Sequence, residues 1–309
     1  MRRALVLGGG SPLGRRVRER LRELDEFESV VGIERVPAAD PHPDGELEFL
    51  SWAPDHRPLA DRLASHGIDT VVDCSLVPDR SGAATRPGGA DVISAMYVGA
   101  AIADERSRVR SWVLASSSAF YPSRSYMPLL HGETAGLPPD AGDRGQSVAE
   151  AEDYARSVAR RMPFLNVAIL RLQELAGDGC VGPLSRWLTL PVSPRVIGFD
   201  PAIQLLHPDD AAGALAWAAR VELAGLYNVA SDGALRWSDA IRSSGRSAVP
   251  IPPLSVELLA PILDRLGIPT LPGAVLDLLR YGTTLDLAKI AAAGWRPAYD
   301  QARCIDTLG

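Results

Sequence analysis

The sequence predicts an α/β fold, a doubly wound parallel sheet with helices on both faces and a smaller C-terminal α/β substrate subdomain. In the first half, short apolar runs alternate with helical patterns, which is typical of such sheets. The first apolar run ends in a glycine cluster that opens a helix. After residue 171 the alternation loosens and Pro, Gly and Trp become frequent. We therefore expect a first domain over residues 1–171, and a mixed region over 172–309 that partly returns to the sheet.

The individual elements follow from apolar periodicity. A continuous apolar run of four to seven residues predicts a buried strand, whereas apolar residues three and four apart predict a helix. The expected strands are 3–7, 29–33, 47–50, 69–74, 111–115 and 164–170, and the expected helices are 12–24, 58–65, 91–104 and 148–161. A helix over 209–220 and a run over 226–229 are expected to return to the sheet. Residues 238–279 are expected to be helical and interrupted by prolines.

Composition and charge exclude several function classes. The chain has 309 residues, a net charge of −6 and no basic block, which gives no support for a nucleic-acid or anionic-membrane partner. Its three cysteines are far apart and show no metal-ligand spacing. No apolar run approaches the roughly 18 residues of a membrane span. We expect a soluble, cytoplasmic protein that acts on a small molecule.

The glycine cluster between the first strand and the first helix indicates a dinucleotide-binding loop. Glycines permit a tight turn and close approach of the backbone to a pyrophosphate, and the helix N-terminus attracts its charge. The residues expected to contact the cofactor here are Gly8, Gly10, Ser11, Leu13 and Gly14. Ser11 stands where a middle glycine is usual, and Pro12 lacks an N–H donor. A plain strand-to-helix turn without ligand therefore remains an alternative.

An acidic residue about 20 positions after the loop bears on the choice of cofactor. Glu34 ends the second expected strand, where a carboxylate accepts hydrogen bonds from ribose hydroxyls and repels a 2′-phosphate. The neighbouring Arg35 favours the opposite choice. We expect NAD or NADP, with NAD preferred.

Several segments together resemble the extended short-chain dehydrogenase/reductase family, the NAD-dependent epimerase/dehydratase group. The segments that carry the resemblance are the Gly8–Gly14 loop, Glu34, and residues 70–74, 112–121, 168–171, 205–210, 227–230 and 294–297. The resemblance implies a Rossmann-type sheet, a substrate subdomain, and hydride transfer between a nicotinamide and a carbon that bears oxygen. It also places Cys74 and Ser75 beside the cofactor, and suggests a homodimer through the helices at 91–104 and 148–161.

The chain departs from the family at the reaction centre. In the family a Tyr, its pKa lowered by a Lys four residues later, exchanges the proton. The matching positions hold Arg144 and Val148, and Lys289 is the only lysine in the chain. The helix position that usually carries Asn holds Asp91. Arg144 either is a surface side chain at a helix start, which we favour, or holds an oxyanion or carboxylate.

Three residues are candidates for the catalytic work. Ser117 falls at the family's Ser/Thr position, although a strand-end serine satisfied by the backbone is an equal alternative. Tyr121 and His131 are possible proton donors, and His131 has the more suitable intrinsic pKa. A solvated loop is the simpler interpretation of His131.

Two function classes follow. The first is an atypical NAD(P)-dependent oxidoreductase or epimerase acting on a hydroxyl or carbonyl group. The second is a catalytically silent dinucleotide sensor or protein-interaction scaffold, favoured by the loss of the Tyr–Lys pair. A fold alone does not decide between them.

Overall fold

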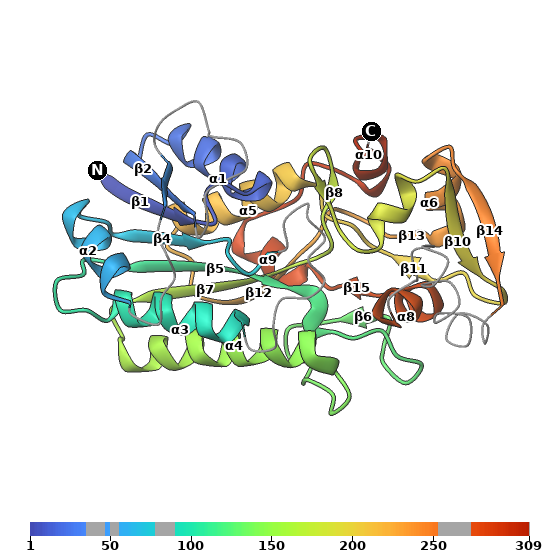
Figure 1. Cartoon of the computed structure of the whole chain (residues 1–309), viewed down its shortest axis with the longest axis horizontal. Helices are drawn as coiled ribbons and strands as arrows, with labels where there is room; N and C mark the ends of the chain where they lie inside the picture. The colour runs from blue at the N-terminus through green and yellow to red at the C-terminus, as the bar shows by residue number, and fades with distance from the viewer. Residues whose placement is uncertain (35–46, 50–55, 78–89, 253–272, 309) are drawn as a thin grey trace.

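The computed structural model describes residues 1–34, 47–49, 56–77, 90–252 and 273–308 (Figure 1). Arg35 and part of the expected helical stretch over 238–279 lie outside the described residues.

A parallel sheet forms the centre of the described chain. Its strand order is β12-β7-β5-β4-β1-β2-β3, and every neighbouring pair is parallel. The order reverses direction at β1, as in a doubly wound sheet. The strands are β1 (Arg2–Leu7), β2 (Phe27–Glu34), β3 (Leu47–Phe49), β4 (Thr70–Asp73), β5 (Ser111–Ser117), β7 (Asn166–Leu172) and β12 (Gly225–Val229). The predicted α/β fold class and the alternating order of its elements are confirmed.

Helices cover the two faces of this sheet. On one face α1 (Pro12–Arg22) packs against α5 (Pro208–Arg220). On the other lie α2 (Arg57–Ser65), α3 (Ala90–Ile102) and α4 (Gly142–Arg161), as Figure 1 shows. Each face has its own apolar core, because the buried residues 4–7 of β1 alternate, with Ala4 and Val6 on one side and Leu5 and Leu7 on the other.

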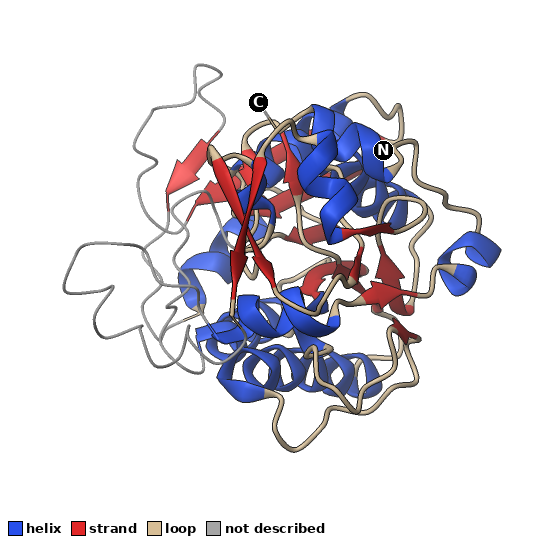
Figure 2. Ribbon diagram, turned by 90° about the vertical axis from the view of Figure 1, so that its right-hand side faces the viewer, coloured by secondary structure: helices blue, strands red, loops and turns tan. Residues whose placement is uncertain are grey.

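The C-terminal part adds a separate apolar core with short strands around it; this part faces the viewer in Figure 2. Its helices are α6 (Trp237–Ser243), α8 (Gly273–Tyr281) and α10 (Gln301–Asp306), whereas α9 (Ala288–Ala293) packs against β12 of the main sheet. Its strand pairs are β8 (Ala176–Gly177) with β9 (Cys180–Val181), β10 (Val192–Val196) with β14 (Ser247–Ile251), β11 (Ala202–Ile203) with β13 (Leu235–Arg236), and β15 (Thr284–Leu285) with β6 (Leu130–His131).

The prediction that residues 238–279 are helical and interrupted by prolines is wrong at β14. Gly245 adopts φ +69°, a left-handed conformation that ends a helix, and β14 then pairs in parallel with β10. The partner strand is distant in sequence, so periodicity alone does not reveal this pairing. The division between residues 171 and 172 stays a prediction.

Candidate functional site

The glycine loop after β1 is closed too tightly for larger side chains. Gly8 adopts φ +69°. A Cβ on Gly9 would stand 2.8 Å from Gly32 Cα, and one on Gly14 would stand 2.0 Å from the Gly8 carbonyl oxygen. Glycine is therefore required for the turn and for the close approach of α1 to β1. This backbone cradle fits the pyrophosphate of a dinucleotide.

The first turn of α1 is capped by Ser11. Ser11 Oγ accepts a hydrogen bond from Gly14 N (3.0 Å) and donates one to the Gly8 carbonyl (2.7 Å). Pro12 occupies the first helical position, and Arg15 N donates to the Ser11 carbonyl. Since Pro12 has no N–H and Gly14 is capped, Leu13 supplies the first-turn amide that this cap leaves for a phosphate.

Glu34 ends β2 beside the same loop. Its Oε2 accepts a hydrogen bond from Gly10 N at 3.0 Å, so the carboxylate lies against the glycine backbone. The sequence placed Glu34 and Gly10 in one cofactor site, and the structure brings them into direct contact.

The end of β4 forms the neighbouring wall of the loop. A Cβ on Gly8 would stand 3.3 Å from the Cys74 carbonyl carbon and 3.4 Å from Ser75 N. Asp73 Oδ1 accepts from Ser75 N (3.0 Å) and from Ser75 Oγ, which also contacts Ser94 Oγ at 2.8 Å. Burial raises the pKa of the Cys74 thiol, so Cys74 is a packing residue rather than a thiolate.

Ser117 is the last residue of β5, at the same carboxyl edge. It begins the short 3₁₀ turn η1 (Ser118–Phe120), where its Oγ accepts a hydrogen bond from Ala119 N at 3.2 Å. This contact agrees with the interpretation of a strand-end serine satisfied by the backbone. The contact of Ser117 with a substrate oxygen stays a prediction.

Tyr121 and His131 lie inside the protein. Tyr121 is 2% exposed and His131 1% exposed, and their rings are stacked with centroids 4.8 Å apart. The Tyr121 hydroxyl donates to Asn228 Oδ1 (2.9 Å) and accepts from Arg171 Nη1 (2.6 Å). Burial raises the pKa of Tyr121 and lowers that of His131. The expectation of a solvated loop at His131 is wrong, and its buried, neutral ring favours a structural role.

A buried ion pair holds this part of the site together. Arg171 on β7 donates two hydrogen bonds to Glu152, from Nε to Oε1 (2.8 Å) and from Nη2 to Oε2 (2.6 Å). Ser116 Oγ donates to the same Glu152 Oε1 at 2.6 Å. The Arg171 guanidinium also lies 3.3 Å from the Phe120 ring centroid. The pair therefore fixes the end of β5, and hence Ser117, against α4.

Arg144, at the start of α4, is paired rather than a plain surface side chain. It forms an ion pair with Asp91 of α3, which is 1% exposed, and donates Nη2 to the Leu76 carbonyl at 2.9 Å. The Arg144 side chain is 36% exposed. Arg144 occupies the position that matches the family's Tyr in the sequence analysis. A cation that cannot release a proton near neutral pH therefore stands there.

Lys289 lies at the other end of the sheet. Its Nζ donates to the Leu226 carbonyl at 2.7 Å and stands 4.7 Å above the Tyr227 ring. Leu226 of β12 pairs with Ile169 of β7. Ile169 lies three residues before Leu172, and Leu172 pairs with Ser117 at the carboxyl edge. At about 3.3 Å per residue, Lys289 is anchored about 10 Å short of the carboxyl edge.

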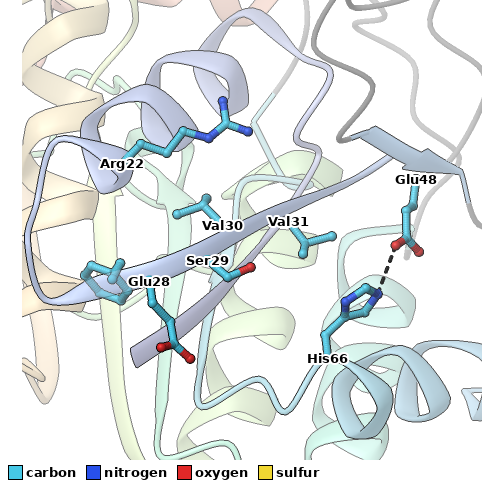
Figure 3. Close-up of a pocket in the computed structure, with 8 residues that line it drawn as sticks. Arg22, Glu28, Ser29, Val30, Val31, Glu48 and His66 are labelled. Atoms are coloured by element: carbon cyan, nitrogen blue, oxygen red, sulfur yellow. Dashed lines mark ion pairs between the residues drawn. The ribbon is translucent and has the colours of Figure 1, made fainter. Parts of the chain in front are cut away.

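Two surface hollows flank the fold. One, of about 550 Å³, is lined by Arg22, Phe27, Glu28, Ser29, Val30, Val31, Glu48 and His66, with an ion pair of 2.9 Å between Glu48 and His66 (Figure 3). It lies along the first half of β2, away from the glycine loop. The second, of about 470 Å³, is lined by Pro12, Arg15, Arg16, Glu19, Asp178, Gly179 and Asp209, beside the first turn of α1. Ligands of such sheets bind at the carboxyl ends of strands, which favours the loop region.

Comparison with known proteins identifies the family. The model of the NAD dependent epimerase/dehydratase family matches residues 4–230. The chain belongs to this family. It is also 31% identical over 316 residues to an uncharacterised protein of Mycobacterium tuberculosis, covering 98% of this chain and 82% of the relative.

Solved structures share the fold over nearly the whole chain. UDP-glucose 4-epimerase from Thermus thermophilus in complex with NAD has a TM-score of 0.74 and 19% identity, covering 99% of this chain and 97% of that one. UDP-glucose 4-epimerase from Thermotoga maritima with UDP-glucose has a TM-score of 0.74, 15% identity and the same coverage. MoeE5 in complex with UDP-glucose and NAD has a TM-score of 0.72 at 19% identity, again with that coverage. The resemblance stated from the sequence, and the NAD(P) cofactor class with it, are confirmed.

The structure reveals polar groups that sequence reasoning did not assign to the site. They are Asp73, Ser94, Glu152, Glu174 and Asn228. Asp73 and Glu174 stand at or just after a buried strand, which was an available signal. Among the described residues, no cluster of three metal-ligating side chains and no helix able to cross a membrane is found.

Proposed function

We propose that this family member is an atypical NAD-dependent oxidoreductase or epimerase-like enzyme, which acts on a hydroxyl or carbonyl carbon without the usual Tyr–Lys pair. The observation that carries the proposal is the glycine cradle of Gly8, Gly9 and Gly14 at the same sheet edge as Ser117. The cofactor supplies a hydride acceptor and donor when bound. The protein supplies binding, orientation and the proton.

The cofactor-binding roles follow from the contacts. Leu13 N–H and the start of α1 would face the pyrophosphate, and Glu34 would accept hydrogen bonds from the adenosine ribose. The Cys74–Ser75 backbone, held by Asp73, would form the wall on the nicotinamide side. A carboxylate at Glu34 repels a 2′-phosphate, which favours NAD over NADP.

Ser117 is the residue proposed to orient the reacting oxygen. It ends β5, and the Arg171–Glu152 pair fixes the adjoining Ser116. Tyr121, with its hydroxyl between Arg171 and Asn228, is proposed to position this strand end rather than to exchange a proton itself. His131 supports Tyr121 by stacking.

A nucleotide sugar is the proposed substrate class. The structures that share the fold over the whole chain, including the C-terminal part, were solved with UDP-glucose or NAD. UDP-glucose is therefore the first probe to use.

The experiment has two stages. Titration with NADH and NADPH, followed by nicotinamide fluorescence, is expected to give micromolar binding of NADH and weaker binding of NADPH. Incubation with NAD⁺ and UDP-glucose is then followed by absorbance at 340 nm and by proton NMR of the sugar. Ser117→Ala is expected to lower turnover about 10²-fold or more. Ser107→Ala, before the opposite end of β5, is the matched control. Absence of NADH binding at millimolar concentration would overturn the proposal.

One observation favours a second candidate, a catalytically silent dinucleotide sensor. Arg144 is locked to buried Asp91 beside the loop wall, and this pair does not provide a proton donor. A sensor would bind NADH tightly, yet show no exchange of substrate hydrogen with NAD⁺ deuterated at C4 for any nucleotide sugar. That result would replace the first candidate with the second.

A further inference from the structure

Glu174 lies at the carboxyl edge of the sheet, beside the end of β5. It follows β7 by two residues, and the last residue of β7, Leu172, pairs with Ser117. Gln173 links the two strand ends. Its Oε1 accepts hydrogen bonds from Ser118 Oγ (2.6 Å) and from Glu174 N (3.1 Å). Neighbouring strands are about 4.8 Å apart, so Glu174 belongs to the same edge as Ser117.

One oxygen of the Glu174 carboxyl group is fixed by the backbone. Oε1 accepts hydrogen bonds from Leu184 N at 2.7 Å and from Ser185 N. The chain wraps so closely here that a Cβ on Gly182 would stand 2.2 Å from Glu174 Cγ. The Ser185 hydroxyl also interacts with the carboxyl group. Within the described part of the chain, both backbone N–H donors go to Oε1 and none to Oε2.

This arrangement determines where a proton resides. Oε1 already accepts two N–H donors, so a protonated Glu174 carries its hydrogen on Oε2 and donates from there. Burial raises the pKa of Glu174 to about 7, against the lowering effect of the two backbone N–H donors and of the Ser185 hydroxyl. Both protonation states are therefore populated near neutral pH, as a general acid–base group requires.

Burial, and not a neighbouring charge, is the main cause of the raised pKa of Glu174. Within the described ranges, no Lys, Arg or His nitrogen lies within 4.0 Å of its carboxylate. The segment whose Leu206 N donates to the Glu174 carbonyl carries His207, which is stacked on Tyr299 and accepts from Asp209 N. On the wrapping side, residues 182–185 include no titratable side chain, and Arg186 follows them.

We propose that Glu174 exchanges the proton of the reacting substrate oxygen through Oε2, as the acid–base group of this chain. In the oxidation direction the substrate O–H bond would break and C=O would form, the cofactor supplying the acceptor for the hydride from the same carbon. The O–H proton would pass to the Oε2 carboxylate. In the reduction direction Oε2 would return the proton to the oxygen, the cofactor supplying the hydride. This inference rests on the proposed function.

The first test needs no turnover. Protein labelled with ¹³C at the glutamate Cδ is titrated by NMR from pH 4 to 9, and the Glu174 resonance is assigned by its loss in Glu174→Gln. We expect one carboxyl resonance to titrate with a midpoint near pH 7. A midpoint near the ordinary pKa of 4.5 would overturn the proposal, since the carboxyl would be fully ionised at neutral pH.

The second test uses UDP-glucose and NAD⁺ with wild type, Glu174→Gln and Glu174→Asp. Glu174→Gln is expected to lower turnover about 10²–10⁴-fold with unchanged NADH affinity, and Glu174→Asp to recover part of the rate. The wild-type pH–rate profile is expected to change slope near pH 7, and Glu150→Gln on the exposed face of α4 to retain it.

The outcomes separate the two proposals. Wild-type turnover that persists in Glu174→Gln with the same pH profile would overturn the role of Glu174 alone. NADH binding without turnover of any nucleotide sugar by the wild type would overturn the enzymatic function, and the role of Glu174 with it.

Discussion

Replacing Arg171 by methionine should strongly destabilise the protein, because its partner is completely buried. Arg171 is 1% exposed and Glu152 0% exposed, and they share two hydrogen bonds of 2.8 and 2.6 Å. The Met side chain fills most of the volume of the Arg171 side chain, but it leaves the Glu152 charge without its main partner. The cost of breaking one member of a buried pair is about 3–5 kcal/mol.

This cost converts into a measurable shift. At about 2.1 cal/mol/K per residue, a chain of 309 residues unfolds with an entropy of about 0.65 kcal/mol/K. Arg171→Met should therefore lower the Tm by about 5–8 °C. Arg156 contacts the same carboxylate at 3.7 Å but is 34% exposed, so Arg156→Met should cost under about 1 kcal/mol, or about 1.5 °C.

Differential scanning calorimetry at pH 7 measures these shifts, with circular dichroism at 222 nm as a second probe. The double variant Arg171→Met with Glu152→Met should recover most of the loss, because it removes the stranded charge as well. If Arg171→Met lowers the Tm no more than Arg156→Met does, the assignment of Glu152 as a charge dependent on Arg171 is refuted.

Three further predictions concern the loop and the sheet edge. Gly14→Ala should abolish NADH binding measured by fluorescence, because its Cβ would stand 2.0 Å from a backbone oxygen; Gly213→Ala, a helical glycine with nothing within 4 Å, should bind normally. Glu34→Gln should weaken NADH binding about tenfold but not NADPH binding, since a hydrogen bond to a charged group contributes about 1.5 kcal/mol; equal weakening of both would contradict the ribose role. The raised pKa of Glu174 means that the native state binds more protons than the unfolded chain between the ordinary pKa of 4.5 and about 7. Its contribution is thus complete below pH 4.5 and falls by about 3 kcal/mol as pH rises to 7; urea unfolding should show this slope in wild type and not in Glu174→Gln.

Local sequence signals were enough to predict the sheet and the position of the glycine loop. Both depend on local signals: continuous apolar runs for buried strands, a glycine cluster followed by a helix, and an acidic residue at the end of the next strand. The contact between Gly10 and Glu34 follows from the adjacency of β1 and β2, which the parallel fold imposes.

Contacts between distant parts of the chain set which polar side chains are buried and what they bind. The sequence indicated a solvated loop at His131. In the structure, β15, more than 150 residues away in the chain, pairs with the strand that contains His131, and the His131 side chain is buried. The pairing of Arg144 with Asp91 likewise joins two helices distant in the chain. The shifted pKa of Glu174 arises from residues 182–185 folding back over it, because desolvation depends on packing and not on neighbours in sequence.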